Sequence, residues 1–148
     1  MGKIILFLML ISANTSIFEN VKQETKLQDD EYVIAVYQSA QACVKCYFQP
    51  MEIIDEVMKG LKETDKIKIL AFVLCRRKKE MKVFKKHYDW KHYMVMDNKN
   101  VRRQIGIDLS SAITVFNSSG DIIFNITDKQ FDGAKQKLYD LLYKELKK

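Results

Sequence analysis

Glycine and proline are scarce in this sequence, which has five glycines and one proline, Pro50, among 148 residues. A loop that cradles a nucleotide phosphate needs several glycines close together, and no such run is present. The residue patterns of glycosidases and other hydrolases are also missing. The sequence therefore offers no support for a nucleotide-binding or hydrolytic function.

Cysteine and histidine are also few, with three cysteines and two histidines. Zinc sites of the ribbon or finger type need a second ligand pair, and Cys75, His87 and His92 do not supply one at that spacing. Three alternatives remain for the single Cys-x-x-Cys pair, Cys43 and Cys46. The pair is a redox dithiol, part of a copper or zinc site completed by the histidines, or two thiols packed as small apolar residues. We favour the dithiol and expect no metal and no bound cofactor.

No apolar run reaches the roughly 20 residues that a membrane-spanning helix needs. A shorter run, Ile4–Ile11, follows Lys3 and precedes the small and polar residues 12–16. This order is typical of a secretory signal peptide. We therefore predict a signal peptide over residues 1–16, an N-terminal tether over 17–30 and one folded domain over 31–148. We expect an exported protein, periplasmic or secreted, with no stable membrane insertion after signal removal.

Charge is plentiful, at 30% of residues with a net charge of +6, beside 47% apolar residues. This balance is ordinary for a globular domain. Basic residues concentrate between Arg76 and Lys86, a pattern that suits nucleic acid or an acidic partner surface. Met81, Phe84 and Tyr88 recur within it at helical spacing, which favours the solvated face of a helix. We expect no nucleic-acid partner.

Apolar periodicity predicts strands that alternate with helices. The expected strands are Tyr32–Tyr37, Ile67–Leu74, Tyr93–Met96, Ile113–Phe116 and Asp121–Ile126, with a hairpin turn at Asn117–Gly120. The expected helices begin near Pro50, cover about Lys78 to Tyr88, include Val101 and Ile105, and run from Asp128 to Lys147 with Thr127 or Asp128 as cap. Residues 17–30 form either a short amphipathic turn or a tether. This order predicts an α/β domain with a mixed sheet and helices on both faces.

The dithiol follows the first strand and precedes a helix, in the order strand, bend, Cys43-Val44-Lys45-Cys46, helix. The reactive species of a dithiol is the thiolate, and a helix N-terminus lowers a thiol pKa through its free N–H groups and positive dipole end. Lys45 adds a positive charge beside the first thiol. The spacing therefore favours thiol–disulfide chemistry.

Two stretches resemble the thioredoxin-like superfamily, most closely its exported oxidoreductases of the alkyl hydroperoxide reductase/thiol-specific antioxidant branch. One is the strand, bend and Cys43–Cys46 motif with Pro50 shortly after it. The other runs without a gap from Gly106 to Ile122 and is similar to the family stretch G-V-x-G-x-P-T-x-F-L-I-D-x-x-G-x-I. The resemblance implies a thioredoxin-like fold with a central mixed sheet of four to five strands and helices on both faces.

The chain departs from the family pattern at several positions, one of which is the helix proline, Pro50, that comes one residue earlier than usual. The family's cis-proline falls on Ser111, where a cis bond would cost about 2.5–4 kcal/mol, so we expect a trans bond or an altered loop. The buried acid of many thioredoxins falls on Tyr37, and the aromatic residue before the first cysteine falls on Ala42. Ala40 stands where peroxidases of this branch carry threonine, which argues against a peroxidase.

The resemblance implies a role for each residue near the dithiol. Cys43 would attack and Cys46 would resolve the mixed disulfide. Lys45 would tune the potential, and Ser111 with Ala112 would lie beside the sulfurs or in the substrate groove.

Cys75 is expected at the carboxyl end of a parallel strand, on the active-site side of the sheet, as a third redox thiol or a small buried residue. The predicted function is disulfide exchange with protein thiols or disulfides and an unidentified redox partner. The alternative is a thioredoxin-like binding or assembly module whose dithiol is non-catalytic or binds metal.

Overall fold

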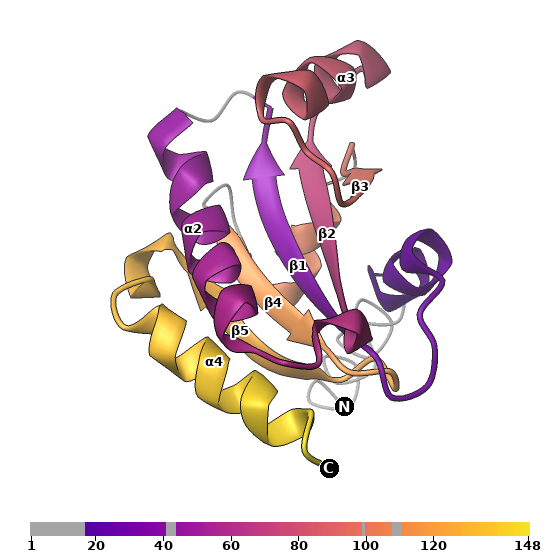
Figure 1. The fold of residues 1–148 in the computed structure, drawn as a ribbon. Helices are drawn as coiled ribbons and strands as arrows, with labels where there is room; N and C mark the ends of the chain where they lie inside the picture. The colour runs from indigo at the N-terminus through magenta and orange to yellow at the C-terminus, as the bar shows by residue number, and fades with distance from the viewer. Residues whose placement is uncertain (1–16, 41–43, 99, 108–110) are drawn as a thin grey trace, which may run out of the picture.

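The structure, a computed structural model, describes residues 17–40, 44–98, 100–107 and 111–148, with the backbone alone at 44–47 and 101. Its centre is a five-stranded sheet in the order β3-β2-β1-β4-β5 (Figure 1). The strands are β1 (Tyr32–Ser39), β2 (Ile67–Leu74), β3 (Tyr93–Met96), β4 (Ala112–Phe116) and β5 (Ile122–Thr127). β1, β2 and β3 are parallel, whereas β4 pairs antiparallel with both β1 and β5. The predicted mixed sheet is confirmed.

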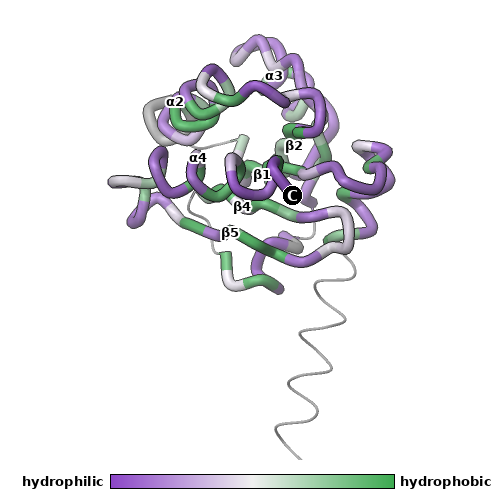
Figure 2. Tube along the Cα trace, turned by 60° about the horizontal axis from the view of Figure 1, so that its bottom comes forward, coloured by the Kyte–Doolittle hydropathy of each residue, from purple (hydrophilic) through white to green (hydrophobic). Residues whose placement is uncertain are grey.

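The central strands are buried on both faces because they are nearly continuous apolar runs. In β1, the side chains of Val33, Ala35 and Tyr37 point to one face, and those of Ile34 and Val36 point to the other. All five are fully buried. In Figure 2 the strands form green, hydrophobic stretches in the middle of the molecule.

Helices cover both faces of the sheet. α2 (Val44–Gly60) and α4 (Ala134–Glu145) lie side by side on the face of Ile34 and Val36 (Figure 1). On the other face, residues 17–25 form a helix whose Ile17 is fully buried against the sheet. α3 (Lys78–His87) follows β2 and lies beyond the carboxyl ends of β1 and β2. Single turns of 3₁₀-helix form at η1 (Thr64–Lys66), η2 (Val101–Ile105) and η3 (Asp128–Gln130).

Two helices begin at residues other than those predicted. The last one does not begin at Asp128, because Gly133 has a φ of 69°, in the left-handed region, and separates η3 from α4. The helix expected near Pro50 instead begins at Val44 and runs continuously through the proline. Pro50 lacks the N–H that would bond to the carbonyl of Cys46, so the turn after the dithiol loses one helical hydrogen bond.

Candidate functional site

The candidate site lies at the carboxyl ends of β1 and β2, where α2 begins. Val44, the first residue of α2, directly follows Cys43, which lies outside the described residues. Lys45 and Cys46 belong to the first turn of α2, and their side chains also lie outside the description. This first turn contains no acidic residue, so no carboxylate offsets the positive end of the helix dipole. A thiolate beside such a helix start is stabilised.

Ser111 and Gln38 form a buried hydrogen bond on the α2 side of the sheet. The Ser111 Oγ donates to Gln38 Oε1 over 3.1 Å, and the two residues are 6% and 1% exposed. The carbonyl of Ser111 accepts a second bond from the backbone N–H of Asp128, at 2.9 Å. Within the described residues, the Gln38 Nε2 is buried with no hydrogen-bond partner. Ser111 is therefore held through both its side chain and its backbone.

An ion pair with no exposed side-chain surface supports this hydrogen bond. Arg102 Nε lies 3.4 Å from Asp97 Oδ2, and both side chains are 0% exposed. Arg102 Nη2 also donates to the backbone carbonyl of Gln38 at 2.9 Å. The N–H of Asp97 donates to the carbonyl of Val73, over 2.8 Å. We call Gln38, Asp97, Arg102 and Ser111 the polar cluster, because it joins β1, β3, η2 and the start of β4.

No family model matches this chain, and no curated protein matches it by sequence. Solved structures do match its fold. A protein from Chlorobium tepidum assigned as the thiol:disulfide interchange protein DsbE aligns with a TM-score of 0.64 at 13% identity, covering 85% of this chain and 84% of that one. An uncharacterized thioredoxin-like protein from Porphyromonas gingivalis also gives a TM-score of 0.64, at 17% identity over 81% and 78%. A secreted disulfide oxidoreductase from Mycobacterium tuberculosis gives 0.53, at 9% identity over 75% and 81%.

This chain has the thioredoxin-like fold. In that fold the helix after the first central strand begins at the dithiol, and here α2 follows β1 in the same way. Ser111, where the sequence resemblance predicts the family's cis-proline to fall, precedes β4 and bonds to Gln38 near the end of β1. The bond before Ser111 involves residue 110, which lies outside the description, so the expected trans geometry stays a prediction.

Tyr37, which the family resemblance aligned with the buried acid of many thioredoxins, is an aromatic residue of β1. Its ring is fully buried and stacks on Phe72 with the centroids 5.1 Å apart. Burial raises the pKa of the Tyr37 hydroxyl well above its ordinary value, and the Asp97 carboxylate raises it further. Thr114, the largest influence after burial, and Arg102 both lower this pKa, but by less than burial raises it. The position therefore holds a neutral phenol at physiological pH.

Cys75 directly follows β2 beside the carboxyl end of β1, as the sequence predicts. It is 5% exposed, and burial raises the pKa of its thiol, as do the carboxylates of Glu80 and Asp97. A thiol in such surroundings stays protonated and is a poor nucleophile. These observations favour the small buried residue over the third redox thiol. Ala112 is fully buried in β4.

The two histidines bear on the alternative in which the Cys43–Cys46 pair belongs to a metal site. His87 ends α3 and His92 directly precedes β3, and both are exposed. The His92 ring lies edge-on to Trp90, with ring centroids 5.3 Å apart. The described residues include no group of three histidine, cysteine or acidic side chains placed to hold a metal ion. Among them, no helix has the length and apolar character needed to cross a membrane.

Sequence reasoning did not single out three members of the polar cluster: Gln38, Asp97 and Arg102. The sequence contains only a weak indication that these polar side chains are buried. Gln38 extends an apolar strand, and Asp97 directly follows one. Arg102 lies in a short turn between the apolar residues Val101 and Ile105. A polar side chain in such a place is buried only when it has a partner, and the partners are distant in sequence.

Proposed function

We propose that this protein is an exported thiol–disulfide oxidoreductase of the alkyl hydroperoxide reductase/thiol-specific antioxidant-like branch that acts through Cys43 and Cys46. The observation that carries the proposal is the start of α2 at Val44, directly after Cys43, in a thioredoxin-like fold. The absence of an acidic residue from the first turn of α2 supports a stabilised thiolate there. Protein thiols and disulfides are the substrates, and no cofactor is needed.

The reaction is two successive thiol–disulfide exchanges. In the reductive direction, the Cys43 thiolate attacks one sulfur of a substrate disulfide, and the other substrate sulfur leaves as a thiolate. The Cys46 thiolate then attacks Cys43 Sγ, which forms the Cys43–Cys46 disulfide and releases the first substrate sulfur. Two electrons have moved to the substrate, and the released thiolates take protons from solvent. The oxidative direction reverses these steps.

The polar cluster supports this chemistry by holding Gln38, five residues before Cys43, and Ser111. Arg102 fixes the carbonyl of Gln38, and the Gln38 side chain fixes Ser111. Ser111 thus takes the place of the family's cis-proline with a hydroxyl that is committed to a buried bond. Lys45 completes the proposed surroundings of the sulfurs. Ala112 has a fully buried side chain, so in this proposal it contributes to the substrate groove through its backbone alone.

The test is equilibration of the purified protein with glutathione buffers, with the state of Cys43 and Cys46 followed by thiol alkylation and mass. We expect a reversible two-electron transition between about −120 and −270 mV. Cys75→Ala is the matched control and should leave the midpoint unchanged, whereas a shift would restore the third-thiol hypothesis. Thiols that stay inert across the whole range would overturn the proposal.

The substitution at Ser111 favours one second candidate, a thioredoxin-like binding or assembly module with a non-catalytic or metal-binding dithiol. The proline that docks the substrate backbone in the family is here a serine that is 6% exposed. Under this alternative, Cys43→Ser retains partner binding and the wild-type dithiol shows no redox transition. One equivalent of tightly held zinc or copper(I) after purification would identify the metal-binding form.

A further inference from the structure

A groove of about 430 Å³ lies between α3 and the end of β1. We call it the α3 groove, and its walls are Ala40, Arg77, Lys79, Glu80, Val83, Phe84, His87 and Tyr88. Ala40 is fixed there, because its N–H donates to the carbonyl of Leu74 over 3.0 Å. Ala40 is also three residues before Cys43 in the chain. The groove therefore lies next to the segment that leads to the dithiol.

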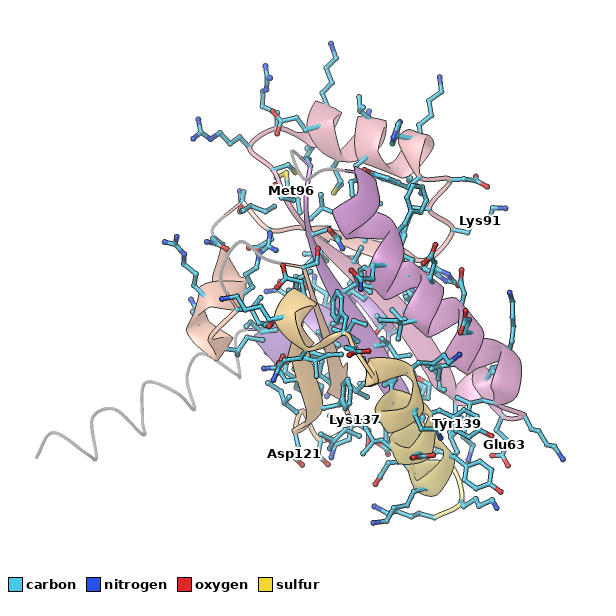
Figure 3. The ribbon with its side chains drawn as sticks, turned by 90° about the vertical axis from the view of Figure 1, so that its left-hand side faces the viewer. Glu63, Lys91, Met96, Asp121, Lys137 and Tyr139 are labelled. Atoms are coloured by element: carbon cyan, nitrogen blue, oxygen red, sulfur yellow. The ribbon has the colours of Figure 1, made fainter. Side chains whose placement is uncertain are left out.

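The helix that forms one wall of the groove is strongly basic, and it contributes Lys79 to the groove itself. α3 has the sequence KKEMKVFKKH, with five lysines and one glutamate. Several long side chains that end in nitrogen atoms project from this helix into solvent at the top of Figure 3. Lys79 and His87 are exposed, and so is Arg77 just before the helix. Within the described residues, no lysine of α3 takes part in an ion pair. The positive charge is therefore open to a partner.

Among the described residues, the one acidic side chain of the groove, Glu80, is bonded to the start of its own helix. Glu80 accepts a hydrogen bond from the backbone N–H of Arg76 at 2.9 Å and one from Arg77 Nε at 3.0 Å. The bond from the Arg76 N–H, followed by that from Arg77, lowers the pKa of this carboxyl, so it stays charged and stabilises the start of α3. Lys79 is left to face solvent across the groove.

Apolar side chains also line the groove, and some of them are exposed to solvent. Val83 is 59% exposed. Phe84 and Tyr88 pack below it with ring centroids 4.8 Å apart. Tyr88 in turn meets Phe48 of α2 edge-on, at 5.7 Å, and Phe48 is itself 45% exposed. A partner that binds here gains apolar contact as well as charge neutralisation.

We propose that the α3 groove docks an acidic protein segment that presents an apolar side chain to Val83. The concave shape fits one or two side chains rather than a flat lipid surface, and the cations complement carboxylates. The inference deepens the proposed function, because it names acidic protein segments as the substrate class that disulfide exchange would act on. Rim charges of this kind increase the rate and selectivity of association more than its strength.

The test uses two fluorescein-labelled peptides without cysteine, one of aspartate, glutamate and a central leucine, the other with asparagine and glutamine in place of the acids. Fluorescence anisotropy with the reduced full-length protein measures their Kd at low and at physiological salt. We expect the acidic peptide to bind at least about tenfold more tightly than the neutral one, and less tightly as salt rises.

Two matched lysine variants locate the binding site. Lys79→Glu reverses a charge in the groove, whereas Lys137→Glu makes the same change on an exposed position of α4, at the other end of the molecule in Figure 3. We expect Lys79→Glu to weaken peptide binding about tenfold and Lys137→Glu less than about twofold. Val83→Ala should weaken binding about threefold without changing the salt dependence. Circular dichroism checks that each variant is folded.

Equal effects of the two lysine variants, or equal binding of the two peptides, would overturn the proposal. Tighter binding of a single-stranded oligonucleotide or of phosphatidylglycerol vesicles, with the same loss in Lys79→Glu, would overturn it in favour of nucleic acid or membrane. Because the peptides have no cysteine, this result is independent of the glutathione titration. If the protein is redox-active but binds neither peptide, the docking proposal is refuted and the oxidoreductase proposal is unaffected.

Discussion

Two ion pairs of this protein show how differently the same charges act in two surroundings. Asp97 and Arg102 form one pair near the carboxyl end of β1, with 3.4 Å between the charged atoms and both side chains fully buried. Glu56 and Lys135 form the other between α2 and α4, with 2.6 Å between the atoms and side chains 54% and 58% exposed. The pair with the shorter distance between its charged atoms, Glu56 and Lys135, is the one that is exposed to water and screened by it. Distance alone is therefore a poor guide to the contribution of an ion pair.

The surroundings decide what each pair does. Water competes for the exposed pair and offsets most of its attraction. The buried charges have lost their hydration, so each depends on its partner and on the hydrogen bond from Arg102 to Gln38. The buried pair thus determines how β1, β3 and η2 meet at the candidate site, whereas α2 and α4 are held by apolar packing whether or not their ion pair forms.

The largest effect is expected for Arg102→Ala. The substitution leaves the Asp97 carboxylate buried without its cation and removes a donor from the Gln38 carbonyl. We expect a loss of about 3–5 kcal/mol in the free energy of unfolding, measured by urea denaturation at pH 7. A change below about 1 kcal/mol would show that water reaches the pair.

A double variant, Asp97→Leu with Arg102→Met, is the control for Arg102→Ala. Replacing both charges by apolar side chains leaves no unpaired charge, so it should be less destabilising than Arg102→Ala alone. The glutathione midpoint of the double variant then shows whether the pair has a role at the dithiol beyond stability.

Ser111→Ala should have the next largest effect. It removes the donor to Gln38 Oε1 in a buried site, and we expect a loss of about 1–3 kcal/mol in the free energy of unfolding. Ser119→Ala, in the exposed hairpin turn, is the matched control and should change little. Equal stability of the two variants would mean that the Ser111–Gln38 bond contributes nothing.

A pH series tests the buried phenol of Tyr37. Because burial raises its pKa, the unfolded chain loses this proton first as the pH rises above the ordinary value of 10.0. The unfolded state then binds fewer protons than the folded one, so the free energy of unfolding should fall above pH 10 and not below it. Tyr37→Phe should make this fall shallower. An unchanged slope would contradict the prediction.

The smallest effect is expected for Lys135→Gln. Lys135 lowers the pKa of Glu56, so this pair contributes only above the ordinary pKa of a glutamate, and the contribution is lost as the pH falls. Both groups are exposed, and we expect no measurable change in the urea midpoint at pH 7 at physiological salt. If Lys135→Gln lowered the free energy of unfolding as much as Ser111→Ala, the exposed pair would contribute more than its exposure predicts, and the contrast with the buried pair would fail.

Much of the fold was predictable because its elements are encoded locally. β2 was predicted at Ile67–Leu74, its observed span, since eight nearly continuous apolar residues form a buried strand in any such sheet. β3 was equally clear. The start of α4 was missed because an apolar stripe persists through Gly133, and only the left-handed backbone of that glycine ends the regular helix.

The candidate site was predictable only in part. The motif placed a dithiol before a helix, and the resemblance singled out Ser111. Neither indicated that Ser111 bonds to Gln38, which is 73 residues away in the chain. Arg102 reaches the Gln38 carbonyl across 64 residues. Such partners cannot be assigned from periodicity, because it reports which face a side chain takes and not which segment lies opposite.

The sequence by itself determined the alternation of strands and helices, the apolar sheet and the position of Cys43 ahead of α2. These depend on interactions within a few residues and on the burial of apolar side chains. Only the tertiary structure decided that Asp97 and Arg102 are buried together beside Gln38, and that α3 and Ala40 enclose a basic groove. A buried charge is stable only beside its partner, and a groove exists only between two packed segments, so both depend on how distant parts of the chain meet.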